Sequence, residues 1–309
     1  MSKFPTDPKL REALIKHRTE NNLSNPQLSK ALGVSPTFLS KYINDKLDHN
    51  PRGFDLQAWD MLKALAERLE MTQSLFVCGF TKAIHGRIDY IRKTADIGCL
   101  SSDSGFGKTS SAKLYQQRNP SSIYACLSDR TRDGKQAERA VFAAVENRDW
   151  KGNASRWEYL VNRFRGSSRV ILIDNAQRLS LSGVTWFCDF RDETECPIVL
   201  FVQDGFHDRI KRDAALTSRM GISKHLAPTS AEIAKSAPRV VAQVATIEQA
   251  EEVADLAVIV AKQAGHYRAV RKQSLLARTI LESCPEIDSF RTAFRMAHQE
   301  LVRDYDLPS

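Results

Sequence analysis

Residues 102–109 combine small side chains, a lysine and a threonine in an order that can hold phosphate groups. The run reads Ser-Asp-Ser-Gly-Phe-Gly-Lys-Thr, between the apolar stretch Ile97–Leu100 and a helix-prone stretch from Ser110. It matches the pattern G-x-x-x-x-G-K-[ST] except that Ser102 replaces the first glycine. Glycines let successive backbone N–H groups turn inward, and the following helix N-terminus adds partial positive charge. The run therefore predicts a nucleotide phosphate site, although a plain Gly/Ser turn is the alternative.

Each residue of this loop has an expected part in binding ATP. Lys108 is expected to reach the β- and γ-phosphates, and the Thr109 hydroxyl to bind Mg²⁺. The residues expected to line the nucleotide are Ser104, Gly105, Phe106, Gly107, Lys108, Thr109 and Ser110.

A second run, Val170–Asp174, ends in a carboxylate. Its four apolar residues are typical of a strand buried on both faces, and ligands of open α/β sheets bind beyond such carboxyl ends. We expect Asp174 to support Mg²⁺ beside Thr109.

Asn175 follows where many related ATPases carry a glutamate, and an amide cannot accept a proton from water. General-base help is typically worth about 10²–10⁴-fold, so slow or partner-dependent hydrolysis is predicted. Three carboxylates could substitute: Asp103, Asp129 and Asp204.

Composition limits the class of protein. The 309 residues carry a net charge of +8, which is compatible with a polyanionic partner. The six cysteines form no C-x-x-C pair and read as small buried hydrophobes in a reducing compartment. No signal-peptide core or membrane-length apolar run is present. We therefore expect a cytoplasmic protein without membrane contact.

The chain divides into three parts by pattern. Residues 1–80 are helical, residues 81–227 alternate strands and helices, and residues 228–309 are helical again. The alternation predicts an α/β core with a parallel sheet flanked by helices. Expected strands are 97–100, 122–127, 170–174, 198–203 and a short one near 224–226. Expected helices are 109–117, 136–147, 155–165, 182–192, 231–236, 247–264, 267–284 and 289–304.

Residues 25–44 read as helix, tight turn, helix. Gly33 suits the turn, Ser35 can cap the second helix, and Pro36 fits its first position. Apolar residues then form an inner face: Leu28, Ala31, Leu32, Val34, Leu39 and Ile43. Short polar residues point outward, as a recognition helix in a DNA major groove requires: Ser35, Thr37, Ser40 and Lys41. A helical hairpin that only packs is the alternative.

Taken together, the phosphate loop, the Asp174 strand and the helix-turn-helix resemble the phage Mu B-like transposition proteins. These are AAA+ target-selector ATPases, and the likeness covers nearly the whole chain. It implies an N-terminal helix-turn-helix domain, an AAA+ core and a C-terminal helical lid domain. It also implies an ATP-dependent helical filament of identical subunits on double-stranded DNA, which selects the target and activates a DDE transposase.

The resemblance also assigns roles to single residues. Gln203 matches the polar residue that ends the sensor-1 strand near the γ-phosphate. Arg219 matches the arginine finger that reaches a neighbouring subunit's nucleotide, with Arg209, Lys211 and Arg212 as alternatives nearby. Arg268 matches the sensor-2 arginine that faces the phosphates. A surface salt bridge is the alternative for each arginine.

Two basic loops are expected to grip DNA phosphates without reading bases. The first, residues 130–135, contributes Arg130, Arg132 and Lys135. The second, residues 148–153, contributes Lys151. Solvated charged loops are the alternative.

Two other functions remain open from the sequence. An ATP-sensing regulator could use the helix-turn-helix for sequence-specific DNA binding. A secretion-type AAA+ ATPase has a similar core, but it is disfavoured by the N-terminal helix-turn-helix.

Overall fold

The computed structural model describes residues 6–20, 24–32, 34–47, 53–55, 58, 76–146, 155–203, 205–301 and 307. By contacts the chain divides into two compact units, residues 1–74 and 75–309. Each unit is described by itself below. Within the described residues, no helix has both the length and the apolar character needed to cross a membrane.

The described part of the first unit contains the helices α1 (Pro8–Glu20), α2 (Asn25–Ala31) and α3 (Pro36–Ile43), and residues 53–55 and 58 are helical as well. The Ser35 hydroxyl accepts a hydrogen bond from Phe38 N at 3.1 Å, and Pro36 occupies the first turn of α3. Helix α3 therefore begins where the capping pattern predicts. Gly33 lies outside the described residues. The small core is built from fully buried side chains, which include Leu10, Leu14, Leu28, Leu39 and Tyr42.

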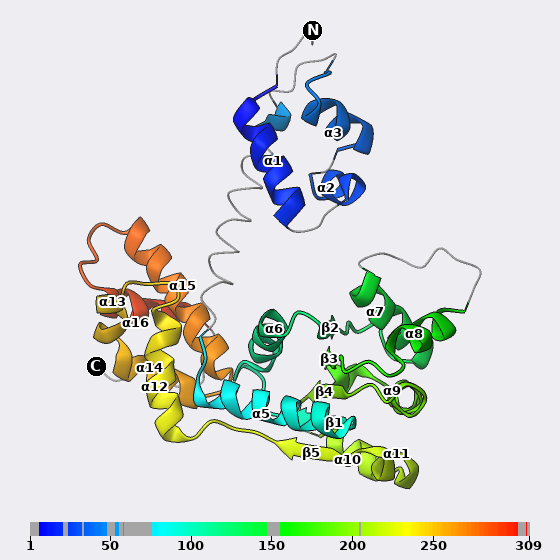
Figure 1. The fold of residues 1–309 in the computed structure, drawn as a ribbon. Helices are drawn as coiled ribbons and strands as arrows, with labels where there is room; N and C mark the ends of the chain where they lie inside the picture. Colours follow the sequence, from blue (N-terminus) through cyan, green and yellow to red (C-terminus); the bar gives the residue numbers. More distant parts are fainter. Residues whose placement is uncertain are drawn as a thin grey trace. The chain divides into compact units, whose positions relative to one another are not determined.

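A five-stranded parallel sheet forms the centre of the second unit (Figure 1). Its strands are β1 (Ile97–Ser101), β2 (Ile123–Cys126), β3 (Ile171–Asp174), β4 (Ile198–Val202) and β5 (Ile222–His225). They lie in the order β2-β3-β4-β1-β5, which confirms the expected α/β class. Ser101 is in register with Val202, and Cys126 with Asp174. The segments that follow β1, β2, β3 and β4 thus leave the same edge of the sheet.

Helices cover both faces of this sheet. β4 is buried along its whole length, with Val199 and Phe201 in one core cluster and Ile198, Leu200 and Val202 in the other. This is the period of two expected of a strand between two layers. The first face carries α5 (Gly79–Thr94) and α6 (Lys108–Arg118). The second face carries α7 (Gly134–Glu146), α8 (Arg156–Phe164), α9 (Leu181–Thr194), α10 (Phe206–Lys211) and α11 (Ala214–Arg219).

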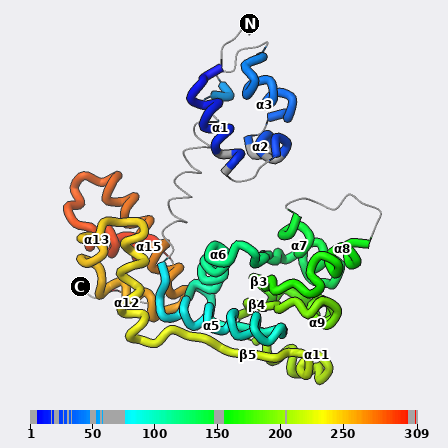
Figure 2. The backbone as a smooth tube through the Cα atoms, viewed as in Figure 1, coloured from blue at the N-terminus to red at the C-terminus, as the bar shows by residue number. Residues whose placement is uncertain are grey.

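The C-terminal helices gather beside α5 and α6 (Figure 2). They are α12 (Ser230–Val241), α13 (Ile247–Glu252), α14 (Ala254–Lys262), α15 (His266–Ser283) and α16 (Phe290–Glu300). Their buried side chains share one core cluster with the first face of the sheet.

Two helices in this part differ from the sequence expectation. The helix expected at 231–236 continues through Pro238 to Val241. Proline removes one backbone donor, but Ala237, Val240 and Val241 on either side of it are buried in the core. The helix expected at 247–264 is interrupted at the fully buried Val253. Neither glycine nor proline marks that interruption, so the sequence gives no signal for it.

Candidate nucleotide site

The fold brings the phosphate loop and the end of β3 into direct contact. The Thr109 hydroxyl donates a hydrogen bond to Asp174 Oδ2 at 2.6 Å, across 65 residues of sequence. Asp174 is buried at the carboxyl edge of the sheet, with 2% of its surface exposed. A threonine hydroxyl held against a buried carboxylate is the arrangement that the loop and strand motifs predict.

The loop between β1 and α6 holds its lysine through backbone carbonyls. Gly105 and Gly107 have φ values of +110° and +100°, which favour glycine. Lys108 Nζ donates to the carbonyl oxygens of Ser102 and Asp103, and to the Ser102 hydroxyl at 3.1 Å. Ser102 is fully buried. The serine in place of the first glycine therefore fits the loop and adds an acceptor for Lys108.

Tyr124 on β2 also contacts Asp174, and sequence analysis did not identify it. Its hydroxyl donates to Asp174 Oδ2 at 2.9 Å, the same oxygen that accepts from Thr109. Burial, followed by the charge of Asp174 and the hydrogen bond to it, raises the pKa of Tyr124. The hydroxyl thus stays protonated and orients the carboxylate. The sequence did hold one signal for this residue: Tyr124 places a polar hydroxyl in the otherwise apolar strand β2, close to the carboxyl edge of the sheet.

The start of α15 rests on the phosphate loop. Arg268 Nη1 donates to the Ser104 hydroxyl at 3.2 Å, and Arg268 N donates to Gly105 O at 3.3 Å. The rings of Phe106 and His266 stack with their centroids 3.6 Å apart. A Cβ on Gly105 would lie 2.1 Å from the carbonyl oxygen of Gly265, so only glycine fits there. The structure therefore places Arg268 beside the residues expected to hold phosphate.

Asn175 has a left-handed backbone, with φ 58° and ψ 33°. Asparagine adopts this conformation more readily than most residues. Its side-chain amide donates to Cys126 Sγ at 3.4 Å. Cys126 is exposed, which corrects the expectation that the cysteines are buried; three of the six, Cys99, Cys188 and Cys196, are.

The carboxylates considered as substitutes for a glutamate have other partners. Asp103 lies 3.7 Å from His266 Nε2, and Asp129 pairs with Arg178 at 3.2 Å. Asp204 lies outside the described residues.

Gln203 follows strand β4, and Arg219 is the last residue of helix α11. Gln203 is exposed immediately after β4. Arg219 ends α11, before β5, and pairs with Asp189 at 2.8 Å and with Asp192. Arg219 is thus engaged within its own chain, and the role in a neighbouring subunit stays a prediction.

The structure describes all of the residues expected to contact DNA except Lys151. Arg130, Arg132 and Lys135 are exposed between β2 and the first turn of α7, whereas Lys151 lies outside the described residues. On and before α3, Ser35, Thr37 and Lys41 are exposed or nearly so, and Ser40 is half-buried. Their contact with DNA stays a prediction.

The donor set fits Mg²⁺ held together with a nucleotide. Within the described residues, no group of three or more His, Cys, Asp or Glu side chains could hold a metal by itself. Mg²⁺ commonly takes few protein ligands and completes its shell with phosphate oxygens and water. The Thr109 hydroxyl would ligate the Mg²⁺ ion, and Asp174, which accepts a hydrogen bond from that hydroxyl, would support it.

Comparison with known proteins agrees with this geometry. Residues 91–210, from the end of α5 to α10, match the family described as AAA domain. The chain thus carries an AAA-type P-loop ATPase domain, a class that binds ATP. No curated protein sequence matches the chain.

Several solved structures are similar to this chain at low sequence identity. Brucella abortus NtrX in complex with ATP is 10% identical, with a TM-score of 0.50 over 85% of this chain and 64% of that chain. Thermotoga maritima RuvB, a Holliday junction branch migration motor, is 16% identical, with a TM-score of 0.46 over 71% and 69%. C. elegans PCH-2 is 13% identical, with a TM-score of 0.46 over 73% and 70%. At 10% identity the likeness to NtrX concerns the fold alone.

Proposed function

We propose that this protein is an ATPase that assembles as a filament on double-stranded DNA in the cytoplasm, selects target DNA for transposition and activates a DDE transposase. The observation that carries the proposal is the combination of two features in one chain. A phosphate loop contacts both Asp174 and the C-terminal helices, and an N-terminal helix-turn-helix presents exposed polar residues.

The nucleotide site supplies the switch in this proposal. Lys108 compensates phosphate charge, Thr109 and Asp174 hold Mg²⁺, and Arg268 faces the phosphates from α15. Arg219 exchanges its pairs with Asp189 and Asp192 for the nucleotide of a neighbouring subunit. An arginine supplied in trans is worth about 10³–10⁵ in rate, so assembly and hydrolysis are coupled.

Hydrolysis is proposed to be slow. The Asn175 amide can orient water, as Gln203 can, but neither group accepts its proton. Slow turnover suits a protein that stays on DNA, because assembly needs the free energy of binding and not that of hydrolysis. Contact with DNA comes from Arg130, Arg132, Lys135 and Lys151, whose charges neutralise phosphates irrespective of sequence.

Electron microscopy with random-sequence duplex DNA tests the proposal. We expect filaments with ATP, none with ADP, and none with the Lys108→Ala variant in ATP. Addition of a transposase encoded by the same element is expected to raise the rate of phosphate release. A protein that binds ATP yet stays monomeric on DNA contradicts the proposal.

A second function is favoured by the outward face of α3. Thr37 and Lys41 are exposed there, which fits an ATP-sensing regulator that reads one DNA sequence. Selection of binding sites from a random library distinguishes the two functions. An enriched motif bound without polymers supports the regulator, and recovery of unrelated sequences supports the filament.

A further inference from the structure

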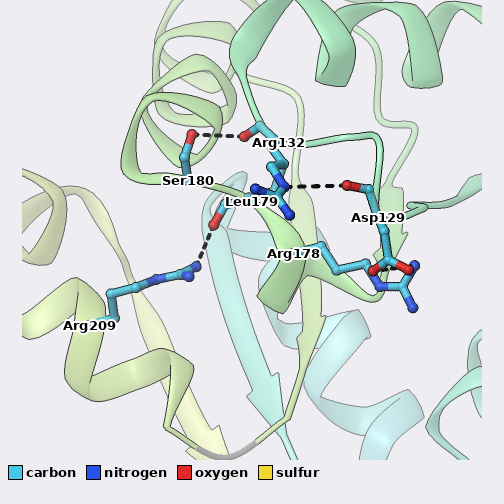
Figure 3. A pocket seen from close by; sticks show the side chains of 6 residues that line it. All are labelled: Asp129, Arg132, Arg178, Leu179, Ser180 and Arg209. Atoms are coloured by element: carbon cyan, nitrogen blue, oxygen red, sulfur yellow. Dashed lines mark hydrogen bonds and ion pairs between the residues drawn. The ribbon is translucent and has the colours of Figure 1, made fainter.

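Three arginines line one hollow at the carboxyl edge of the sheet (Figure 3). Arg132 comes from the segment after β2, Arg178 from the 3-10 turn η1 (Ala176–Arg178) after β3, and Arg209 from α10 after β4. The other lining residues are Asp129, Leu179 and Ser180, and the hollow has a volume of about 290 Å³. We call it the three-arginine hollow. No residue of the phosphate loop lines it.

The segment that carries Arg132 is tied to the start of α9. Its carbonyl oxygen accepts hydrogen bonds from Ser180 N at 2.9 Å and from the Ser180 hydroxyl at 2.8 Å. A Cβ on Gly183 would lie 2.5 Å from the same oxygen, so the close approach requires glycine. These contacts fix the backbone of Arg132 beside the hollow, and its side-chain Nε donates to Asp129 O at 3.4 Å.

Arg209 is positioned by the segment between η1 and α9. Its guanidinium donates to Gln177 O at 3.3 Å and to Leu179 O, and lies 4.7 Å from the centre of the Phe206 ring. Its Nε is buried without a hydrogen-bond partner within the described residues. The two backbone hydrogen bonds and the ring contact hold the Arg209 side chain beside the hollow.

The charge of the hollow is unbalanced. Three arginines and one carboxylate, that of Asp129, line the hollow, an excess of two positive charges. Asp129 pairs with Arg178 at 3.2 Å, but its side chain is 83% exposed, so this pair is weak. No aromatic side chain lines the hollow. Guanidinium groups favour phosphate oxygens.

We propose that the three-arginine hollow is a phosphate-binding site separate from the ATP site, and that it takes a phosphate group of the DNA backbone. The choice of DNA rests on the proposed function, whereas the phosphate chemistry rests on the hollow itself. Arg178 and Arg209 thereby extend the DNA-contacting surface beyond the exposed loop that carries Arg130 and Arg132.

The first arm of the test measures affinity for a labelled mixed-sequence duplex, with ATP, over a range of salt concentrations. Each phosphate contact adds about 0.9 to the slope of log affinity against log salt. Because the hollow takes one phosphate, we expect the Arg132→Gln/Arg178→Gln double variant to lower that slope by about one and to bind about tenfold or more weakly at 0.1 M salt. Thermal melting checks that the variant is folded.

Two further variants make this arm specific. Arg165→Gln is the matched control: Arg165 pairs with Glu193 and follows α8, before β3, at the opposite edge of the sheet. It removes one positive charge and should leave the slope unchanged. Asp129→Asn removes the carboxylate of the hollow and should tighten DNA binding two- to fivefold. Weaker binding by Asp129→Asn overturns the electrostatic assignment.

The second arm uses inorganic pyrophosphate as a probe, titrated by calorimetry into protein saturated with ADP. If the double variant loses pyrophosphate binding yet keeps wild-type DNA affinity, the hollow is a phosphate site supplied by a small phosphate compound. If the double variant equals wild type in both arms, the proposal is overturned. If wild-type protein does not bind duplex at all, the proposed function fails, and pyrophosphate binding still decides the hollow.

Discussion

The nucleotide site and the three-arginine hollow lie at the same edge of one parallel sheet, but the sequence encodes them differently. Most of the phosphate loop is a continuous run, and its backbone glycines and Lys108 can be read directly. The hollow takes one arginine from each of three segments that follow β2, β3 and β4. A contiguous motif builds a site from backbone geometry, whereas the hollow exists only because parallel strands end together.

The two sites also treat their charges differently. Lys108 is held by three oxygen atoms of its own loop, and Thr109 and Tyr124 share one oxygen of Asp174. In the hollow, three cations are left with one exposed carboxylate. The first site is pre-organised for one ligand, and the second is a less selective receptor for negative charge.

Removal of the loop lysine has the largest expected effect. Lys108→Ala should weaken ATP binding more than about 100-fold, because the charged partner of the phosphates is lost, and should leave pyrophosphate binding at the hollow unchanged. Titration with a fluorescent ATP analogue measures the first quantity and calorimetry the second. Lys82→Ala, which removes an exposed lysine on α5, is the control. Loss of both activities together would show that the two sites are one.

Asn175→Glu should raise ATP turnover about tenfold. General-base help is worth about 10²–10⁴-fold, but a glutamate in the left-handed conformation of Asn175 costs about 1–2 kcal/mol, which offsets part of the gain. Phosphate release per subunit measures it, and shorter filament lifetimes should accompany it. Asn175→Asp is the comparison that keeps a short side chain. Unchanged turnover in both variants would show that Asn175 does not limit hydrolysis.

Tyr124→Phe should weaken Mg²⁺-ATP binding about tenfold, since hydrogen bonds to charged groups contribute roughly 1.5–3 kcal/mol. Binding of ATP in the presence of EDTA should change little, because Tyr124 acts on Asp174 and not on the phosphates. Titration in both conditions separates the two. Because the pKa of Tyr124 is raised above its ordinary value, its ionisation should not weaken binding up to about pH 10. Equal losses with and without Mg²⁺ would contradict this positioning role.

Arg291 supplies the baseline for an arginine that only stabilises structure. It makes two hydrogen bonds of 2.7 Å to Asp255 and binds Glu252 O at 2.8 Å, joining α16 to α13 and α14. The hydrogen bond from Arg291 lowers the pKa of Asp255 from 3.8 to about 2. Because the folded pKa is depressed, this contribution is present above about pH 4 and is lost as the pH falls towards about 2.

Arg291→Gln should therefore lower the free energy of unfolding by about 1 kcal/mol or less, given the exposure of the pair. Urea unfolding at neutral pH and again near the lowered pKa of Asp255 measures the difference, which should shrink at the lower pH. DNA affinity should not change. A DNA defect as large as that of Arg132→Gln/Arg178→Gln would remove the distinction between structural and phosphate-binding arginines.

The strands, the phosphate loop and the helix cap at Ser35 could be predicted from the sequence, each for a physical reason. The strands were found because a strand buried on both faces must be apolar throughout, as 198–202 is. The loop and Asp174 were found because both sit at fixed positions relative to strand ends. The cap at Ser35 was found because it is a local interaction.

What escaped prediction depends on tertiary packing. Tyr124 meets Asp174 only because β2 and β3 are neighbours in register. Pro238 stays inside α12 because buried residues on both sides hold the helix. Arg178 and Arg209 lie 31 positions apart in sequence and on different elements, so no spacing rule links either of them to Arg132.

The stack of Phe106 on His266 has a mechanical consequence. His266 opens α15, a rigid rod of 18 residues, which spans about 27 Å at about 1.5 Å per residue. The helix packs against α12, α14 and α16, so its first turn connects the phosphate loop with the C-terminal helices. A fluorescent probe at Ser283, the last residue of α15, would test whether nucleotide binding at the loop is felt at the far end of the helix.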